Sequence, residues 1–279
     1  MLIDVKPRIR QPRTRSDIDW SHPITRALRF AYTVDSARPY GDLVRGRNGV
    51  PTSGVSMKTN PYGIGMDLAG VSDNLDFGSG GIPNAGGSVS VFARLKAKSI
   101  TGEFGSSSGI GSTGGLFHWR LTASVAVAFF LNSVGSFTST ITSVAGHWTD
   151  IGIAYTYGGP TRFFIRNLST GIIQYQTIAG AFVPIVSAGG CSIGANYGGS
   201  NGLNSPILLT YFWDRVLTDN EFLALSVEPY AFVMPVRPVE RTLVKYPWNH
   251  SWGTVPRLVL SSSDRLFQVP AHPQQGRGY

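Results

Sequence analysis

Two glycine-rich motifs that could do chemistry lie next to each other in this chain. Gly105-Ser-Ser-Ser-Gly109 matches G-x-S-x-G, the turn that presents a nucleophilic serine, and Gly109-Ile-Gly-Ser-Thr-Gly114 matches the dinucleotide-binding pattern G-x-G-x-x-G. Both patterns work only where a helix follows the glycines. Here Leu116-Phe-His-Trp-Arg120 follows, and this run is typical of a strand. We therefore expect neither activity.

Carboxylates at short spacing could support glycoside hydrolysis, which needs an acid and a nucleophile on either side of the scissile bond. The chain has no E-x-D-x-x-E run. Outside residues 218–221, its closest acidic pairs are Asp73 with Asp76 and Asp17 with Asp19. The first pair falls at a predicted hairpin turn and the second in a polar N-terminal segment. The sequence therefore predicts no enzyme.

Residues that could ligate a metal are scattered along the chain. The five histidines are His22, His118, His147, His250 and His272. None of them has a partner at zinc-ligand spacing. Asp73, Asn74 and Asp76 offer oxygen ligands for Ca²⁺, but such residues also stabilise turns, and we favour the turn. Cys191, the single cysteine, lies in a strand-like run typical of the core. We expect no metal and no cofactor.

Aromatic and amide side chains in predicted loops are better suited to binding than to catalysis. They are Tyr40, Tyr62, Asn196, Tyr197 and Asn201. Aromatic rings can stack on sugars while amides bond to sugar hydroxyls. The same residue types are also enriched where proteins contact one another. Their spacing does not separate sugar binding from protein docking, and both interpretations stay open.

The net charge of +8 belongs to the two ends of the chain. Residues 1–29 and residues 236–279 each sum to +4, and the residues between them sum to zero. Such arms can dock on acidic proteins or on nucleic acid. No aromatic residue is interleaved with the basic residues of 1–19, which counts against stacking on single-stranded nucleic acid. We expect protein partners, contacted through Arg8, Arg10, Arg13, Arg15, Arg237, Arg241 and Trp248.

Short strands dominate the predicted structure between these arms. Leu28, Phe30 and Tyr32 alternate as the apolar face of one strand, and residues 88–97 alternate in the same way. About twelve such strands, separated by Gly-rich turns, have the spacing of a sandwich or barrel. No apolar run approaches the roughly 20 residues of a membrane span, and the N-terminus lacks the apolar region of a signal peptide. We expect no membrane association.

One short helix is predicted with clear ends. The strand-like run Tyr211-Phe-Trp213 leads into Thr218 and Glu221, which have the spacing of a capping box. Pro229 biases Glu228 away from the helical region and should end the helix. The polar residues of this segment are interpreted as closing the fold rather than as a site: Asp214, Arg215, Thr218 and Glu221.

Five segments carry motifs that occur in one order in a known domain type. They are His22-Pro-Ile-Thr-Arg-Ala-Leu28, residues 67–78, residues 147–159, Arg162-Phe-Phe-Ile-Arg-Asn167 and residues 212–225. In order they resemble P-x-x-R-G-L, the hairpin F-x-G-x-D-D-Y-V-x-F-G, W-H-x-V-A-x-T-Y-D-G, L-Y-V-D-G and I-W-N-R-A-L-S-x-x-E-I-x-A-L. Together they resemble the laminin-G-like, or concanavalin A-like, jelly-roll domains of tailed-phage virion proteins. Ala27 stands where that family has glycine, and His147 precedes the tryptophan instead of following it.

The resemblance implies an all-β concanavalin A-like (laminin-G-like) jelly-roll sandwich with one short helix and extended N- and C-terminal arms. We expect a basic arm at 1–23, the sandwich at 24–230 and a proline-rich arm at 231–279. The ending Pro229-Tyr-Ala-Phe-Val-Met-Pro235 resembles the close of such domains in phage virion proteins.

The resemblance also implies a non-enzymatic structural role in a tailed-phage virion, such as capsid decoration or cementing or another head, neck or tail component. The arms would dock on other virion proteins in a homo- or hetero-oligomeric assembly. The protein would be made in the host cytoplasm and located in the virion. The alternative is a lectin-like carbohydrate-binding module that recognises a host-surface glycan.

Overall fold

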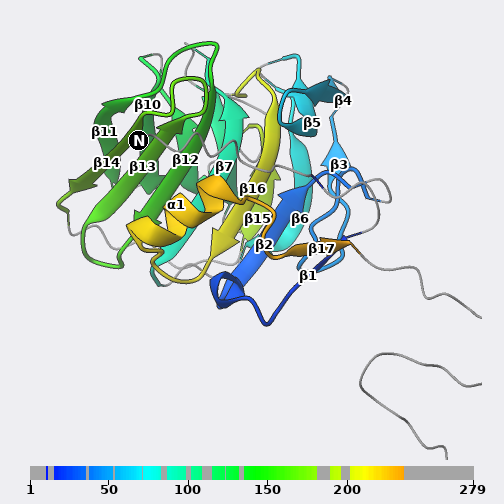
Figure 1. The fold of residues 1–279 in the computed structure, drawn as a ribbon, viewed down its shortest axis with the longest axis horizontal. Coiled ribbons are helices and arrows are strands. Elements are labelled where there is room, and N and C mark those ends of the chain that lie inside the picture. The colour runs from blue at the N-terminus through cyan, green and yellow to red at the C-terminus, as the bar shows by residue number, and fades with distance from the viewer. Residues whose placement is uncertain are drawn as a thin grey trace, which may run out of the picture. The chain divides into compact units, whose positions relative to one another are not determined.

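A computed structural model describes this chain at residues 11, 16–35, 38–52, 54–70, 72–82, 87–98, 102–108, 115–122, 124–131, 135–180, 189–195 and 202–235. Within this part the chain folds into two antiparallel β-sheets that pack face to face, with one α-helix on the outer face of the larger sheet (Figure 1). The predicted all-β jelly-roll sandwich with one short helix is therefore confirmed. None of the helices in the described residues is long and apolar enough to cross a membrane.

The smaller sheet has seven strands, each antiparallel to its neighbours. In spatial order they are β11 (Gly135–Thr142), β10 (Ala126–Leu131), β9 (Gly115–Leu121), β8 (Gly102–Ser108), β15 (Gly189–Ile193), β6 (Leu75–Ile82) and β3 (Val50–Pro51). Strands β9, β10 and β11 follow one another in sequence and in space. These three strands therefore form a meander.

The larger sheet has eight strands. In spatial order they are β14 (Ile173–Ile178), β13 (Thr161–Asn167), β12 (Trp148–Tyr155), β7 (Val89–Lys96), β16 (Ile207–Trp213), β5 (Gly63–Leu68) and β4 (Val55–Asn60), with β2 (Leu28–Thr33) also paired to β16. A separate two-stranded sheet pairs the first described strand with the last one. In it β1 (Ser16–Ile18) pairs with β17 (Val233–Pro235). The remaining elements are the 3₁₀ helix η1 (Pro23–Thr25) and the helix α1 (Asp219–Val227).

Two apolar clusters hold these layers together. Between the sheets, inward residues such as Val91, Ile153 and Phe212 form the main core. On the outer face of the larger sheet, Phe92 and Phe222 belong to a second cluster beneath α1. The central strands β7, β12 and β16 are therefore buried on both faces. Burial of this apolar surface is the main contribution to the stability of the sandwich.

A buried ion pair lies under α1. The Arg94 guanidinium on β7 donates to the Asp150 carboxylate on β12 at 2.5 and 2.8 Å, and both side chains are fully buried. Arg94 also donates to the Ser226 carbonyl at 2.8 Å, while the Ser226 hydroxyl donates to Asp150. Next to the pair, a Cβ on Gly152 would lie 2.6 Å from the Phe222 ring. The sheet therefore contacts α1 through one buried polar network, in which Arg94 Nη1 has no hydrogen-bond partner among the described residues, and through one position without a side chain.

The predicted hairpin at residues 67–78 is wrong. Strand β5 belongs to the larger sheet and β6 to the smaller one, so the chain crosses between sheets here. The physical reason is that Leu68 and Leu75, on either side of the turn, both bury their side chains in the shared core. The Asp73 carboxylate accepts the N–H groups of Ala69 at 2.9 Å and Gly70 at 2.7 Å. Asp73 thus stabilises the crossing turn.

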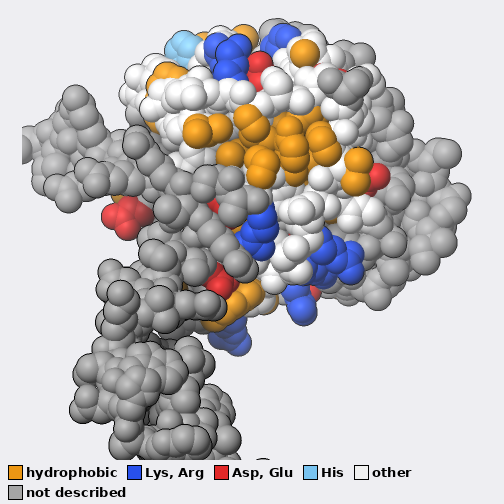
Figure 2. Space-filling view, turned by 90° about the vertical axis from the view of Figure 1, so that its right-hand side faces the viewer, with side chains coloured by type: hydrophobic (Ala, Val, Ile, Leu, Met, Phe, Trp, Pro, Cys, Tyr) orange, Lys and Arg blue, Asp and Glu red, His pale blue; other side chains and the backbone are white. Residues whose placement is uncertain are grey.

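One side of the sandwich carries exposed apolar surface. Figure 2 shows hydrophobic side chains gathered on the side of the molecule where β3 and β4 lie in Figure 1. On and beside these strands, Tyr40, Val55 and Met57 are partly buried against the core, and Val50 is exposed. The two edge strands leave this end of the core less covered than the centre.

Candidate ligand-binding cleft

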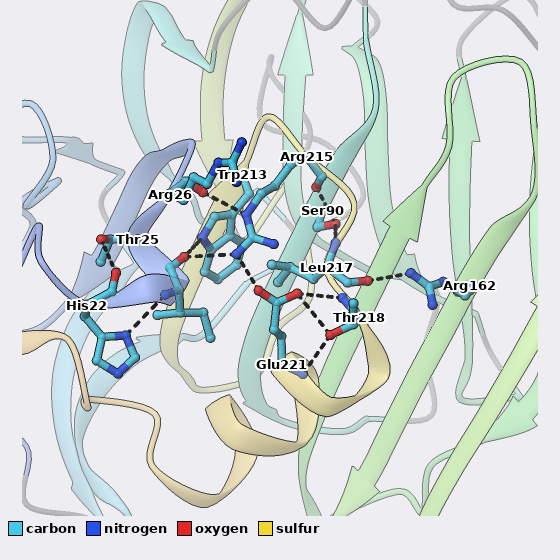
Figure 3. Close-up of polar contacts among 11 residues, drawn as sticks. His22, Thr25, Arg26, Ser90, Arg162, Trp213, Arg215, Leu217, Thr218 and Glu221 are labelled. Carbon is cyan, nitrogen blue, oxygen red and sulfur yellow. Dashed lines mark hydrogen bonds and ion pairs between the residues drawn. The ribbon is translucent and has the colours of Figure 1, made fainter.

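The segment before β2 is bound to the connection between β16 and α1 (Figure 3). The indole N–H of Trp213 donates to the Ile24 carbonyl at 2.8 Å, and Arg215 Nε donates to the Arg26 carbonyl at 2.8 Å. The Asp214 N–H donates to the Ala27 carbonyl at 2.9 Å. Two regions almost 190 residues apart in sequence therefore form one rigid corner.

The entry segment has its own local structure. His22 caps η1, because its Nδ1 accepts the N–H of Ile24 at 3.3 Å, and Pro23 follows in the first turn. Ala27 ends the segment at φ +59°, in the left-handed region. The P-x-x-R-G-L motif that this segment resembles has glycine at this position. The corner thus holds an alanine in a conformation that suits glycine.

The helix start on the other side of the corner has the predicted capping box. Thr218 Oγ1 accepts the Glu221 N–H at 3.2 Å, and Glu221 Oε2 accepts the Thr218 N–H at 2.8 Å. Glu221 also binds Arg215 at 2.6 Å. Burial alone would raise the pKa of Glu221, but the hydrogen bonds from Arg215 and Thr218 outweigh it and lower that pKa. Glu221 is therefore held as a carboxylate and is committed to the corner.

An open cleft of about 1150 Å³ lies along this corner. Residues from the entry segment, from the loop after β2 and from the start of the β16–α1 connection line it. Those whose side chains could bind a ligand are Trp20, His22, Arg26, Arg29, Arg45 and Asp214. The Trp20 side chain is 56% exposed, which makes it one of the most exposed large apolar residues described. The cleft therefore combines an open aromatic surface with polar side chains.

Ion pairs fix part of the cleft wall. Arg29 Nε binds Asp214 Oδ2 at 2.6 Å. Partial burial raises the pKa of Asp214, and the positive charges of Arg29 and Arg45 only partly oppose that effect. Arg29 and Asp214 therefore offer a paired donor and acceptor at the surface of the cleft. A pair of this kind can bond to hydroxyl groups.

Two of the aromatic residues predicted to bind sugar are described, and neither lines the cleft. Tyr40 packs partly buried against the main core. The Tyr62 ring meets Trp148 edge to face at 5.6 Å between centroids and lies 5.8 Å from the Arg94 guanidinium carbon. Both rings thus have structural contacts, and a role in sugar binding stays a prediction for them.

Several predicted site residues lie outside the described part of the chain. They are the loop residues Asn196, Tyr197 and Asn201 and the arm residues Arg8, Arg10, Arg13, Arg15, Arg237, Arg241 and Trp248.

The residues that line the cleft were not predicted as a binding site from the sequence. A signal for one of them was present, because Trp20 is a large apolar residue within the polar run Asp19-Trp-Ser-His22. Arg26 and Arg29 lie in one segment, whereas Arg45 and Asp214 come from two others, so these residues share no sequence pattern.

The glycine-rich motifs and the possible metal ligands do not come together as a site in the described residues. Residues 105–108 of the G-x-S-x-G match lie inside strand β8, and the rest of both glycine motifs lies outside the described residues. Among described residues, no three His, Cys, Asp or Glu side chains gather as metal ligands. Burial raises the pKa of the Cys191 thiol well above its usual value. The side chains that line the cleft beside Trp20 are suited to binding a ligand.

Comparison with known proteins gives the fold. No protein-family model matches the chain, and no curated protein matches it. Among solved structures it is similar to the binding domain of Paraclostridial Mosquitocidal Protein 1, at TM-score 0.53 and 12% identity over 72% of this chain and 52% of that one. It is also similar to domain 4 of AbnA, a GH43 extracellular arabinanase from Geobacillus stearothermophilus, in complex with arabinotriose. That match has TM-score 0.51 and 14% identity over 71% and 97% of the two chains.

A third similar structure is the binding domain of Botulinum Neurotoxin DC in complex with SialylT. Its TM-score is 0.51 and its identity 14%, over 74% of this chain and 52% of that one. The chain therefore spans about half the length of the two toxin chains that it matches. At these identities the similarity establishes a β-sandwich fold shared with binding domains.

Proposed function

We propose that this chain is a carbohydrate-binding module and that the cleft beside Trp20 is its binding site. The observation that carries the proposal is an open cleft in which a half-exposed indole lies among hydrogen-bonding side chains. A sugar ring has an apolar C–H face, which can stack on an indole, and hydroxyl groups, which need donors and acceptors. His22, Arg29 and Asp214 supply such groups.

The solved structures with this fold support the proposal. The arabinanase domain, which this fold matches over 97% of its length, was solved in complex with arabinotriose. The neurotoxin binding domain, matched over 52% of its length, was solved in complex with SialylT. The structure supports it further, because the corner that forms the cleft is rigid. The hydrogen bonds of Trp213 and Arg215 fix the backbone of the entry segment before any ligand arrives. A preformed site loses less conformational entropy on binding.

A glycan array probed with the full-length chain tests this function. We expect binding to a defined set of oligosaccharides, and we expect Trp20→Ala to weaken it by at least about tenfold, as truncation of a buried aromatic contact does. Tyr157→Ala is the matched control, since Tyr157 is similarly exposed, at 43%, and does not line the cleft. Absence of binding to any glycan, or equal losses in the two variants, would contradict the proposal.

A second candidate function is a non-enzymatic structural role in a phage virion, in which the two basic ends of the chain would dock on other virion proteins. Ser16 pairs with Pro235 in the β1–β17 sheet, so the two basic ends of the chain join the body at neighbouring points. Gln11 is bound to the body too: its side-chain amide exchanges hydrogen bonds with the Ile64 backbone at 2.5 and 2.7 Å. Both arms could then contact the same acidic virion protein. Removing residues 1–10 and measuring how much of the protein is incorporated into virions tests this function. The role in the virion predicts that incorporation is lost.

A further inference from the structure

We propose that the cleft selects sugars that carry an acidic group, either a carboxylate or a sulfate. This inference rests on the proposed carbohydrate-binding function and specifies the chemical class of its ligand. It follows from which charged side chains of the cleft are already paired and which are not.

Both acidic side chains of the cleft are already bound to arginines. Asp214 binds Arg29 at 2.6 Å, and Glu221 binds Arg215 at 2.6 Å. These contacts leave two more arginines in the lining, Arg26 and Arg45, both of them exposed. No carboxylate of the described residues lies within 4.0 Å of either guanidinium. The cleft therefore has two positive charges that form no ion pair with a described residue, although the charge of Arg45 also opposes the raised pKa of Asp214.

His22 adds a further donor to the same wall. Its Nδ1 accepts the N–H of Ile24 (Figure 3), so in the neutral ring the proton is on Nε2. No acceptor in the described segments is bonded to this Nε2–H. Arginine forks bind carboxylate and sulfate oxygens in a bidentate manner, and an imidazole N–H can complete the set. The donors of the cleft thus outnumber its available acceptors.

The positive charge is local to the cleft and is not a property of the whole body. Residues 16–235 carry thirteen Lys or Arg and thirteen Asp or Glu, so the body has no net charge. A neutral body that keeps two unpaired arginines beside an exposed tryptophan is suited to a ligand with one apolar face and one anionic group. Acidic sugars have both features.

The test is an array of matched oligosaccharides that share one neutral core and differ in one substituent: none, a sialic acid, a uronic acid or a sulfate. The full-length chain is used throughout. Because the arms carry +8, they attract every anion to some degree. The deciding comparison is therefore between variants that keep the arms and differ only in the cleft.

We expect the wild-type chain to bind acidic members about tenfold or more tightly than the neutral core, as charged hydrogen bonds do. The double variant Arg26→Gln/Arg45→Gln should reduce this preference to about twofold or less, because it should weaken binding of the acidic members far more than binding of the neutral core. Arg47→Gln is the matched control, because Arg47 lies in the same loop as Arg45 but does not line the cleft. The relative binding of carboxylated and sulfated members identifies the anion.

Two results would overturn the inference in different ways. Equal, Trp20-dependent binding of acidic and neutral members would reject acidic selectivity and leave the carbohydrate-binding function in place. A preference that survives in Arg26→Gln/Arg45→Gln would assign the charge effect to another surface, and so would also reject it. If no member binds, the proposed function itself fails.

Discussion

At the scale of single residues, Ala27 has a backbone conformation that lowers the stability of the corner. Its φ of +59° is unfavourable for alanine by roughly 1–2 kcal/mol. Its carbonyl accepts the Asp214 N–H, so the conformation is part of the contact between the entry segment and the β16–α1 connection. The sequence indicates this position, because alanine stands there in place of the glycine of the motif that the segment resembles, but only the backbone angle shows the consequence.

Ala27→Gly should stabilise the protein. Glycine removes the steric cost of the left-handed conformation, and its larger unfolded-state entropy offsets roughly 0.5–1 kcal/mol of that gain. We expect a net increase of about 0.5–1 kcal/mol in the free energy of unfolding, measured by urea denaturation. Ala31→Gly, in the buried strand β2, is the control and should destabilise. A loss of stability in Ala27→Gly would show that the angle is not a source of strain.

The binding residues could be predicted only in part from the sequence, for reasons visible at this scale. The exposed Trp20 stands in a polar run, a local signal that can be found without a structure. Arg26 and Arg45 line the same cleft but come from segments whose proximity depends on the fold. Tyr62 is in a loop, as predicted, yet its ring packs on Trp148. Contacts between distant segments are not encoded in local spacing.

At the scale of elements, α1 combines one predictable feature with one that was not predicted. Its capping box and its end before Pro229 follow from local residue types and were predicted correctly. Its position on the sheet depends on Arg94, Asp150 and Ser226, which lie on three elements. In the sequence, Arg94 and Asp150 look like ordinary polar positions of alternating strands. Their burial follows only once α1 covers that face.

Breaking the buried pair should cost far more than breaking a surface pair. Arg94→Met leaves Asp150 buried without its partner, and we expect a loss of about 3–5 kcal/mol in the free energy of unfolding. Lys58→Met is the control, since Lys58 and Asp67 form an exposed pair at 3.4 Å and the change should cost about 1 kcal/mol or less. The double variant Arg94→Met/Asp150→Leu should recover part of the loss. Similar costs for Arg94→Met and Lys58→Met would contradict this account of α1.

At the scale of the whole molecule, the chain is a neutral body that joins two basic ends at neighbouring points. The β1–β17 pairing, with Ile18 and Val233 buried in the outer cluster, creates this arrangement. The sandwich of short strands and the single helix could be predicted, because alternation and capping are local. The crossing at residues 67–78 could not, since a hairpin and an inter-sheet turn have the same local pattern.

Two deletions at the N-terminus should distinguish the contribution of the arm to thermal stability from that of β1. Removing residues 1–10 keeps Gln11 and β1, so we expect thermal stability to change by no more than a few degrees. Removing residues 1–18 also removes β1 and the buried Ile18, and unfolding should occur at a clearly lower temperature. Scanning calorimetry of the two truncated chains checks this. An equal effect of both deletions would show that β1 does not contribute to the body.

The central claim is that the cleft beside Trp20 holds a sugar, and one measurement tests it most directly. It is a crystal structure of the full chain with the tightest glycan found on the array. We predict that the sugar ring lies on the Trp20 indole, with its polar groups toward His22, Arg26 and Arg45. A sugar bound at Tyr40 or Tyr62, with the cleft unoccupied, would contradict the account.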